Sequence, residues 1–438
     1  MRSDLILIGS AALGLSLAPA EASDGASSRD DVIYTIKPGD TLIDIGRKYL
    51  ISPQAYRAVQ RHNAIRDPLR LRPQTRLAIP VQYLKATLHD AQVVAFRGTV
   101  QVLQKGQAAP VQLQMRLVEG ATIETGSDGF VTLQLANGSR MSMPSNTRLR
   151  IARMRTYRIN RGADLDFQVE RGRVETKAAP LDNPASRFRI RTPVAVTAVR
   201  GTVFRVGYSG PGAPSTSEVV EGKVSVDHSV VPAQVDLATG FGAAASQDGA
   251  LEREELLPAP MLAGSAKLQR DPELTFALVP SDAARGYQVQ IARDAGFVDV
   301  LAEGRSNTPS LTFADLPNGT YFLRAMAIAP SGLVGLAETH AFLRNRESAS
   351  AAALPGPERA FRFDWNLGDA GPPAYRLQIF AAQNQAVPVV DEPGLTAPGM
   401  TVTALPNGKY TWRVGQVRVI DGTPEEYWTP LESFSIDF

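Results

Sequence analysis

Apolar and polar residues alternate through most of residues 91–248, and this period of two favours β-structure over helix. In GFVTLQLANGSRMSM, the side chains of Val131, Leu133 and Leu135 share one face of a predicted strand. Asn137-Gly138 is typical of a tight hairpin turn, and the alternation resumes after it. Such turn signals recur about every ten residues. We therefore predict an all-β domain with at least about ten strands.

The tetrad Arg-Gly-Thr-Val occurs twice in this region, at residues 97–100 and 200–203. Glycine inside a strand usually marks a bulge or a close approach of two backbones, and Thr and Val favour extended structure. We expect Gly98 and Gly201 to lie within strands, and the two tetrads to occupy neighbouring strands of one sheet.

Three segments of the same region, FRIRTPVAVTAVRGTVFRV, SEVVEGKVSVD and ATGFGAAA, resemble the FecR domain. Thr192-Pro193 and Arg200-Gly201-Thr202 are the most specific part of this resemblance, which covers residues 91–248. It implies a large β-roll or sandwich, in a family whose members regulate iron uptake by passing a signal through a membrane to a sigma factor. Those regulators carry a cytoplasmic N-terminal region and a spanning helix. We find neither here, so we expect the fold without that relay.

Residues 33–80 predict a small β-α-α-β module. Tyr34-Thr35-Ile36 forms a short strand, and Thr41 is placed to cap the first helix. Ser52-Pro53 opens the second helix, with proline at its first position. Residues 75–79 provide the second strand.

The opening of this module, YTIKPGDTL, and the order of its elements resemble the LysM domain. Domains of that family bind glycans containing N-acetylglucosamine, chiefly peptidoglycan and chitin, between the loop after the first strand and the loop after the second helix. The resemblance implies that small polar and backbone groups contact the acetamido groups, while Leu42 and Ile65 cover the sugar face. The implied binding residues are Gly39, Asp40, Thr41, Leu42, Asn63, Ala64 and Ile65.

Two positions depart from the LysM pattern. Ile43 stands where an aromatic residue is frequent, and Gln74 stands where the family usually turns with Pro-Gly. Because Gln tolerates positive φ poorly, we expect another turn type or a strained turn there. The alternative to glycan binding is that Gly39, Thr41 and Asn63 only form turns and cap helices.

The C-terminal part of the chain contains a repeat of about 90 residues. YQVQIA, beginning at Tyr287, matches YRLQIF at Tyr375, and LPNGTYFLRAMAI matches LPNGKYTWRVGQV. Short alternating strands in units of this size predict β-sandwiches, which resemble fibronectin type III or immunoglobulin-like modules. We place the two units at residues 266–345 and 359–438, joined by a linker at 346–358.

One segment is unusually basic, since residues 148–161 contain six arginines and no acidic residue. In an exported protein such a segment could contact an anionic cell-wall polymer or lipid head groups, and we expect no nucleic acid partner. The alternative, which we favour, is a solvated β-surface balanced by Asp164, Asp166 and Glu170. The candidate contact residues are Arg148, Arg150, Arg153, Arg155, Arg158 and Arg161.

Residues 1–22 are typical of a secretory signal peptide, with Arg2, an apolar stretch at Leu5–Leu17 and small residues before a cleavage site near Ala22. The apolar stretch would span only about 20 Å as a helix, against about 30 Å for the bilayer core. We therefore expect export to the periplasm, cleavage, and no membrane span in the mature chain. The alternative is an uncleaved anchor.

No motif for catalysis or metal binding is found. The sequence contains no cysteine, which excludes disulfides, thiolate zinc sites and cysteine nucleophiles. Its four histidines, His62, His89, His228 and His340, show no metal-binding spacing. We therefore expect no enzyme activity, no catalytic residue, no metal and no cofactor.

Together these features predict a mainly β, multidomain protein with a small βααβ module, a large all-β domain and two C-terminal sandwiches. The predicted function is to bind peptidoglycan through the LysM-like module and to present the β-domains to an envelope protein partner. The alternative is a FecR-type signalling protein that senses a partner, without its own cytoplasmic anti-sigma arm.

Overall fold

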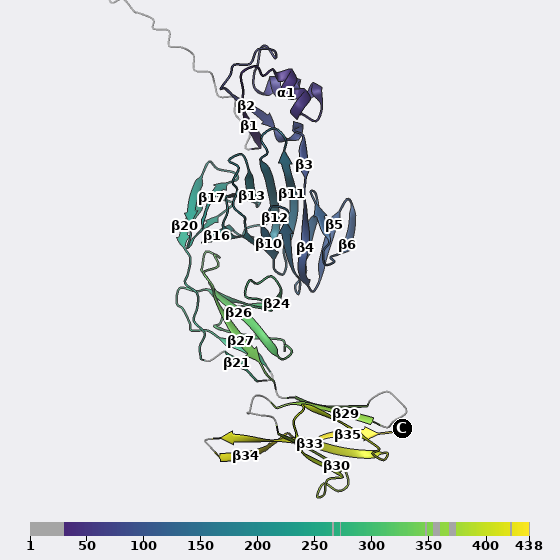
Figure 1. Cartoon of the computed structure of the whole chain (residues 1–438). Helices are drawn as coiled ribbons and strands as arrows, with labels where there is room; N and C mark the ends of the chain where they lie inside the picture. The colour runs from purple at the N-terminus through teal and green to yellow at the C-terminus, as the bar shows by residue number, and fades with distance from the viewer. Residues whose placement is uncertain are drawn as a thin grey trace, which may run out of the picture. The chain divides into compact units, whose positions relative to one another are not determined.

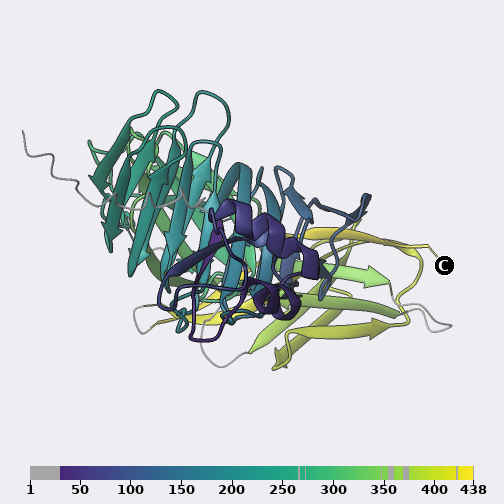
Figure 2. The same cartoon turned by 90° about the horizontal axis from the view of Figure 1, so that it is seen from above.

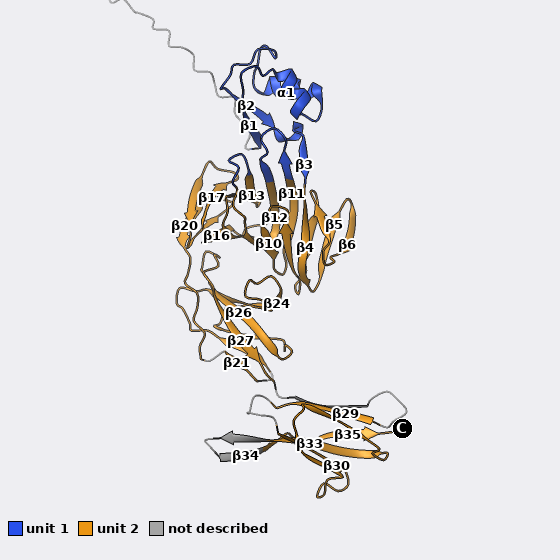
Figure 3. Cartoon of the chain, in the orientation of Figure 1, with its two compact units in different colours: residues 1–88, 155–164, 182–186 blue, residues 89–154, 165–181, 187–438 orange. Residues whose placement is uncertain are grey.

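The computed structural model describes residues 30–264, 267–271, 273–346, 348–353, 360–367, 374–420 and 423–437. The predicted signal peptide at residues 1–22 lies outside these residues. Strands make up 54% of the structure and helices 6%, which confirms the mainly β, multidomain prediction. The chain divides into two compact units (Figure 3). Unit 1 contains residues 1–88, 155–164 and 182–186, and unit 2 contains residues 89–154, 165–181 and 187–438.

Unit 1 holds the small module in the predicted β-α-α-β order. Thr41 accepts a hydrogen bond at its Oγ1 from the Asp44 backbone N–H (3.1 Å) and so caps the first helix, as predicted. Ser52-Pro53 opens a short 3₁₀ turn, and the second α-helix begins only at Tyr56. The elements are β1 Asp31–Thr35, α1 Leu42–Tyr49, η1 Pro53–Ala55, α2 Tyr56–His62, β2 Arg76–Pro80, η2 Val81–Tyr83 and β3 Ala86–Leu88.

The two strands of the module pair antiparallel, with Tyr34 opposite Leu77. Gln74, in the turn before β2, has φ +65°, so the departure from Pro-Gly does produce the strained backbone expected there. Strand β3 pairs with Arg155–Tyr157, and Tyr157 joins the hydrophobic core of this unit.

Strands β4 to β20 belong to a closed barrel, which confirms the prediction of a large all-β domain (Figure 1). One antiparallel run follows the order β7-β4-β9-β10-β12-β15-β16-β19-β20, and another follows β13-β14-β17-β18. In Figure 2 the teal strands of the second half lie side by side. The strands are β4 Asp90–Arg97, β5 Val100–Gln104, β6 Gln107–Pro110, β7 Arg116–Val118, β8 Thr122–Thr125, β9 Phe130–Leu135, β10 Arg140–Met143, β11 Arg148–Tyr157, β12 Ala163–Lys177, β13 Arg187–Arg191, β14 Ala195–Val199, β15 Val203–Tyr208, β16 Ser215–Glu221, β17 Lys223–His228, β18 Gln234–Ala238, β19 Phe241–Ala245 and β20 Leu251–Glu255.

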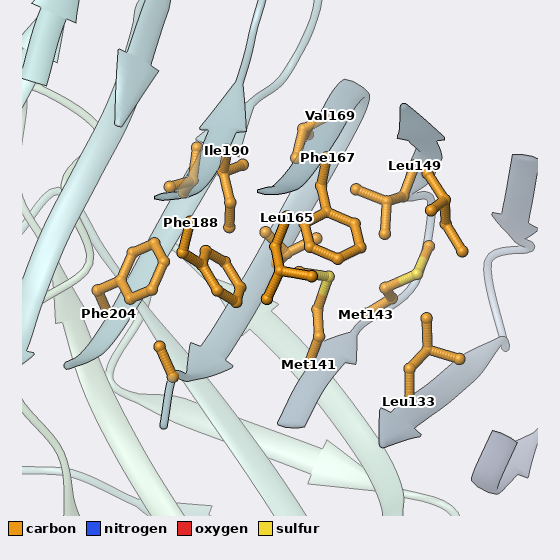
Figure 4. Packing of buried hydrophobic residues seen from close by; sticks show 14 of the residues in the cluster. Leu133, Met141, Met143, Leu149, Leu165, Phe167, Val169, Phe188, Ile190 and Phe204 are labelled. Atoms are coloured by element: carbon orange, nitrogen blue, oxygen red, sulfur yellow. The ribbon is translucent and has the colours of Figure 1, made fainter. Parts of the chain in front are cut away.

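The alternating apolar residues of the barrel fill a single core (Figure 4). Val131, Leu133 and Leu135 are all buried there, as their shared face predicts. Aromatic rings continue the core into the second half of the barrel, where Phe188 lies 5.6 Å from Phe167 between ring centroids. Edge-to-face and tilted arrangements of this kind add to the burial of apolar area.

Gly98 and Gly201 of the two Arg-Gly-Thr-Val tetrads lie between strands, so the prediction that these glycines lie within strands is wrong. The first connects β4 to β5 and the second connects β14 to β15. The registers place β4 beside β7 and β9, and β15 beside β12 and β16, so the tetrads are not on neighbouring strands either. Both glycines have positive φ, +61° at Gly98 and +96° at Gly201.

The repeated glycine is nevertheless required by close backbone approach. A Cβ on Gly98 would lie 2.2 Å from the Asp128 carbonyl oxygen, and one on Gly201 would lie 2.8 Å from Pro180 Cα. The threonine carbonyl that follows each glycine accepts a backbone hydrogen bond, at 2.8 Å for Thr99 and 2.9 Å for Thr202. The repeated glycine is thus explained by one shared constraint, because both turns combine positive φ with a neighbouring backbone too close for a Cβ.

The C-terminal repeat forms two β-sandwiches, as predicted. The first places the sheet β21-β27-β26-β23-β24 with the pair β22-β25, and the second places β31-β30-β33-β34 and β35 with β28-β29-β32. The first comprises β21 Leu268–Gln269, β22 Leu274–Ala277, β23 Gly286–Ala292, β24 Val300–Ser306, β25 Ser310–Phe313, β26 Gly319–Ile328 and β27 Glu338–Arg344. The second comprises β28 Ser348–Ala353, β29 Ala360–Asn366, β30 Tyr375–Ala381, β31 Val390–Leu395, β32 Gly399–Thr403, β33 Gly408–Ile420, β34 Thr423–Trp428 and β35 Glu432–Ile436.

Strand β28 lies inside residues 346–358, the segment expected to be a linker. It pairs antiparallel with β29, with Ser348 opposite Asn366. The second sandwich therefore begins within that segment. Ser and Ala carry little periodic signal, which is why composition alone indicates a loop here.

A polar row crosses the outer face of the barrel beneath the first sandwich. The registers align Thr132 with Ser142, Ser142 with Glu175, Glu175 with Arg205, and Arg205 with Glu218. We name these five residues the docking row. Thr132 Oγ1 donates to the Val298 carbonyl of the first sandwich at 2.9 Å. Glu218 is fully buried, although alternation alone would predict a solvated position.

Candidate glycan-binding site

The loop after β1 is organised around Asp40. Its carboxylate Oδ2 accepts hydrogen bonds from the Tyr34 hydroxyl and the Lys37 backbone N–H, both at 2.8 Å. Burial, together with the hydrogen bond to Asp40, raises the pKa of Tyr34. Gly39, at φ +86°, is exposed at the tip of this loop. Asp40 therefore shapes the loop, while Gly39 leaves its tip free of a side chain.

The loop after α2 is fixed by the Asn63 side chain. Its Nδ2 donates to the carbonyls of Val59 (2.8 Å) and Ala78 (2.7 Å), and its Oδ1 accepts from the Ala78 N–H at 2.8 Å. Ala64 follows at φ +51° and is exposed. The bond to Val59 stays within the end of α2, and the two bonds to Ala78 join that end to β2, so the Asn63 side chain has a structural role.

The two loops lie against each other. The Leu42 N–H donates to the Pro68 carbonyl at 2.8 Å, which joins the start of α1 to the loop after α2. Leu42 itself is fully buried in the core, so it does not cover a sugar face as expected. Ile65 is half-buried, and Leu69 of the same loop is 60% exposed. Leu69, which follows Pro68, is an exposed apolar residue of this loop that the sequence analysis did not single out.

The loops have committed most of their N–H donors. The N–H of Asp40 donates to Lys37, that of Ala64 to Arg61 and that of Ile65 to Gln60, all to backbone carbonyls. The loops therefore leave few free backbone N–H donors for a ligand, and the exposed side chains of the loop after α2 include Arg66, Leu69 and Arg70.

The basic segment divides between the two units. Arg155, Arg158 and Arg161 belong to unit 1. Arg148 and Arg153, in unit 2, are each paired with carboxylates, and Arg150 is exposed.

The carboxylates around Arg148 and Arg153 include two of those expected. Arg148 binds Glu170 (2.7 Å) and Glu124 (2.6 Å), and these hydrogen bonds, Glu170 first, raise its pKa. Arg153 binds Asp166 at 2.5 Å. Asp164 instead accepts from the Tyr157 hydroxyl at 2.8 Å. Charge balance therefore accounts for Arg148 and Arg153 as expected, but Asp164 and Asp166 are fully buried, so the expectation of a solvated surface is wrong at these two carboxylates.

The described ranges contain neither a metal-binding cluster nor a membrane-spanning helix. Within them, no group of three or more His, Asp or Glu side chains is arranged to hold a metal ion. The helices that the structure describes are too short and too polar to cross a bilayer. His62 pairs with Asp31 at 2.7 Å, and His228 is buried against the Ser246 carbonyl at 2.9 Å.

Two parts of the chain match known families. Residues 34–80 match the family described as LysM domain, and residues 121–225 match the family described as FecR protein. The chain thus contains a LysM domain and a FecR domain, which confirms both resemblances. These are non-catalytic families of binding and regulatory domains, and they indicate glycan binding and envelope signalling.

Similarity to solved structures is distant. Two structures of an anti-sigma factor from Parabacteroides distasonis ATCC 8503 match at 17% identity, with TM-scores of 0.26 and 0.27, over 31% of this chain. The chain spans 59% of the length of those structures. A two-domain fibronectin type III segment of chicken tenascin matches at 12% identity and TM-score 0.19, over 39% of this chain and 99% of that segment. No curated protein matches the chain.

Proposed function

We propose that this chain is a non-enzymatic, exported protein that binds the N-acetylglucosamine glycan of peptidoglycan through its LysM domain. The supporting observation is the hydrogen bond between Leu42 N–H and the Pro68 carbonyl, which brings the two loops of the family's binding region together. The ligand would meet the exposed loop tips at Gly39 and Ala64 and the exposed side chain of Leu69. The FecR barrel and the sandwiches are then presented to an envelope protein partner in the periplasm.

The alternative function is FecR-type signalling, in which the barrel senses a partner. It is favoured by the FecR match over residues 121–225. The state of the N-terminus separates the two proposals. Intact-mass measurement of the protein purified from its own envelope should show cleavage near Ala22. A retained N-terminal segment would support an anchored signalling protein.

Glycan binding is tested by co-sedimentation with purified peptidoglycan, comparing Leu69→Glu with Ile51→Glu. Both side chains are exposed aliphatic residues of unit 1, at 60% and 63%, but only Leu69 lies on the paired loops. Losing an apolar contact of this size costs about 1.5 kcal/mol or more. We therefore expect roughly tenfold weaker pelleting for Leu69→Glu, and wild-type pelleting for Ile51→Glu.

Three other results would redirect the proposal. If neither variant differs from wild type and binding falls steeply with salt, the contact lies on basic surface such as the 148–161 segment. Equal loss in both variants would indicate general damage to the module. If the wild type itself stays in the supernatant, the LysM fold is present without this ligand and the signalling alternative leads.

A further inference from the structure

A polar cleft of about 1090 Å³ lies in unit 2 where the FecR barrel meets the first sandwich. The barrel side is formed by the bend of β12 at Arg171–Arg173 and by the β19–β20 hairpin, including Glu252. The sandwich side is formed by the end of β24, from Glu303 to Asn307, and by Arg285. Clefts of this size usually accommodate ligands larger than a single small metabolite.

The barrel and the first sandwich, which form the two sides of the cleft, are joined by a network of charged bonds that includes one lining residue, Arg173. Arg324 of the sandwich holds Glu175 of the docking row with both terminal nitrogens, at 3.0 and 2.8 Å. Arg205 donates to the Gly335 carbonyl at 2.7 Å, and Arg173 donates to both oxygens of Glu218 at 2.8 Å. Bidentate, buried pairs of this kind hold two surfaces in one register. The cleft is therefore preformed.

The charges inside the cleft leave two guanidinium groups, Arg285 and Arg305, without a carboxylate partner among the described residues. Arg173 is neutralised by Glu218, Arg285 donates only to the Pro330 carbonyl at 3.4 Å, and no ion pair or side-chain hydrogen bond joins the Arg305 guanidinium to any residue that the structure describes. Arg305 reaches the water of the cleft, but crowding by protein atoms and the nearby charge of Arg173 lower its pKa. The guanidinium groups of Arg285 and Arg305, neither paired with a carboxylate, therefore favour an anion in the cleft.

The cleft also exposes backbone. Strand β24 is the terminal strand of its sheet, so one row of its N–H and C=O groups faces away from β23. Glycines contribute further bare backbone to the walls, at Gly172, Gly207, Gly286, Gly304 and Gly332. Backbone groups beside a terminal strand are the recognition surface for an extended peptide.

We infer that this cleft binds an extended peptide segment that carries a carboxylate. The carboxylate is held by Arg305, and the peptide backbone runs along the edge of β24. The acidic groups of the lining, Asp248, Glu252 and Glu303, disfavour a polyanion and suit a peptide with mixed charge. This site is separate from the glycan-binding loops and does not depend on them.

The test is selection of a displayed random octapeptide library on the purified full chain, followed by affinity measurement of enriched peptides by fluorescence anisotropy. We expect enriched sequences to carry Asp, Glu or a free C-terminal carboxylate. Arg305→Gln should weaken their binding at least about tenfold, as expected for loss of a charge-assisted pair. Arg293→Gln is the matched control, because Arg293 of the same sandwich is 68% exposed, is paired with Asp299 and lies outside the lining.

The outcomes divide cleanly. Failure to enrich any peptide, or peptide binding that Arg305→Gln leaves unchanged, would overturn the inference. Binding of the polyanion heparin with no binding of peptides would overturn it as well. Unchanged thermal unfolding of Arg305→Gln shows that a loss of binding is local. The source of the peptide is resolved with soluble peptidoglycan fragments, assayed with and without their stem peptides. Binding only with stem peptides indicates the wall, and binding to neither form indicates a protein segment.

Discussion

The two sandwiches carry the same arginine and glutamine at matching positions but use them differently. In the first, Arg324 Nε donates to Gln290 Oε1 at 2.7 Å, and in the second Arg413 Nε donates to Gln378 Oε1 at 3.0 Å. The terminal nitrogens of Arg324 then bind Glu175 of the barrel. Each guanidinium also lies over an aromatic ring of its own sandwich, Arg324 over Phe297 and Arg413 over Trp428, both 4.3 Å from the centroid, but no ion pair among the described residues joins Arg413 to a carboxylate.

The neighbouring position explains the difference. Met326 of the first sandwich faces the barrel, where its Sδ accepts from Arg205 at 3.3 Å. Gly415 is its counterpart, and a Cβ there would lie 2.8 Å from Trp428. Trp428, on the hairpin β33–β34, therefore covers the face that the first sandwich gives to the barrel. The first sandwich thus packs this face against the barrel, whereas the second sandwich covers the equivalent face with its own Trp428.

Glu218→Gln should have the largest effect on this comparison. Glu218 is fully buried, binds Arg173 and accepts from the Val334 N–H at 3.2 Å. Removing its charge takes the ion-pair partner from the buried Arg205 and the partly buried Arg173 and leaves Glu175 as the nearest carboxylate, which costs about 3 kcal/mol. Calorimetry should show the barrel and first-sandwich transition at lower temperature, with the second-sandwich transition unchanged. A loss below about 1 kcal/mol would mean that the docking row adds little stability.

Arg324→Gln and Arg413→Gln form the next, matched pair. Arg324→Gln leaves Glu175 without its bidentate partner, at a cost of about 1–3 kcal/mol. Arg413→Gln removes a cation–π contact of about 0.5–1 kcal/mol and no carboxylate pair. Denaturant unfolding and protease sensitivity of the β24–β26 segment measure both. Equal effects of the two substitutions would remove the distinction between docked and self-closed faces.

Acid should weaken the docked sandwich first. Burial would raise the pKa of Glu175, but the charges of Arg324, Arg205 and Arg173 outweigh it and hold the pKa below its ordinary value. The contribution of Glu175 is therefore present above its unfolded pKa of about 4.3 and lost as the pH falls through the lower folded value. Stability curves measured between pH 7 and pH 3 should show this loss, and Arg324→Gln should flatten it. A slope that persists in Arg324→Gln would assign the acid sensitivity to other groups.

Tyr321→Phe and Tyr410→Phe should have the smallest and most nearly equal effects. Each hydroxyl donates to a proline carbonyl four residues earlier in the same sandwich, at 2.9 and 2.8 Å. Loss of one such bond costs about 0.5–1.5 kcal/mol. The two copies should behave alike here because the contact is internal to each. A difference of more than about 1 kcal/mol between them would show that docking strains the first sandwich.

Sequence patterns predicted the elements well where a single face is buried. The alternation around Leu133, the cap at Thr41 and the matching LPNG segments each depend on local chemistry and are confirmed. The same patterns carry no signal where two surfaces are buried. Arg205 and Glu218 are charged residues of the strands, yet the first sandwich covers both. Period-two patterns report the core face and do not show what covers the other face.

The binding residues were harder to predict than the fold. Leu42 follows the capping residue Thr41, and its helical spacing predicts burial as strongly as the family resemblance predicts contact with sugar. In the structure burial prevails. Leu69 was missed because one exposed aliphatic residue in a loop has no periodicity. The tetrads were misplaced because steric demand at Gly98 arises from Asp128, about thirty positions away in sequence, which no local pattern reports.

The arrangement of the docking row also determines how much force is needed to separate the first sandwich from the barrel. Its members stand side by side on β9, β10, β12, β15 and β16, in a line across the strands. A pull on the first sandwich along the strand direction loads the whole line in shear, so its bonds share the force. A pull across the strands peels the line open one strand at a time, at lower force. A protein anchored at one end and pulled at the other would therefore resist force well along the strand direction and poorly across the strands.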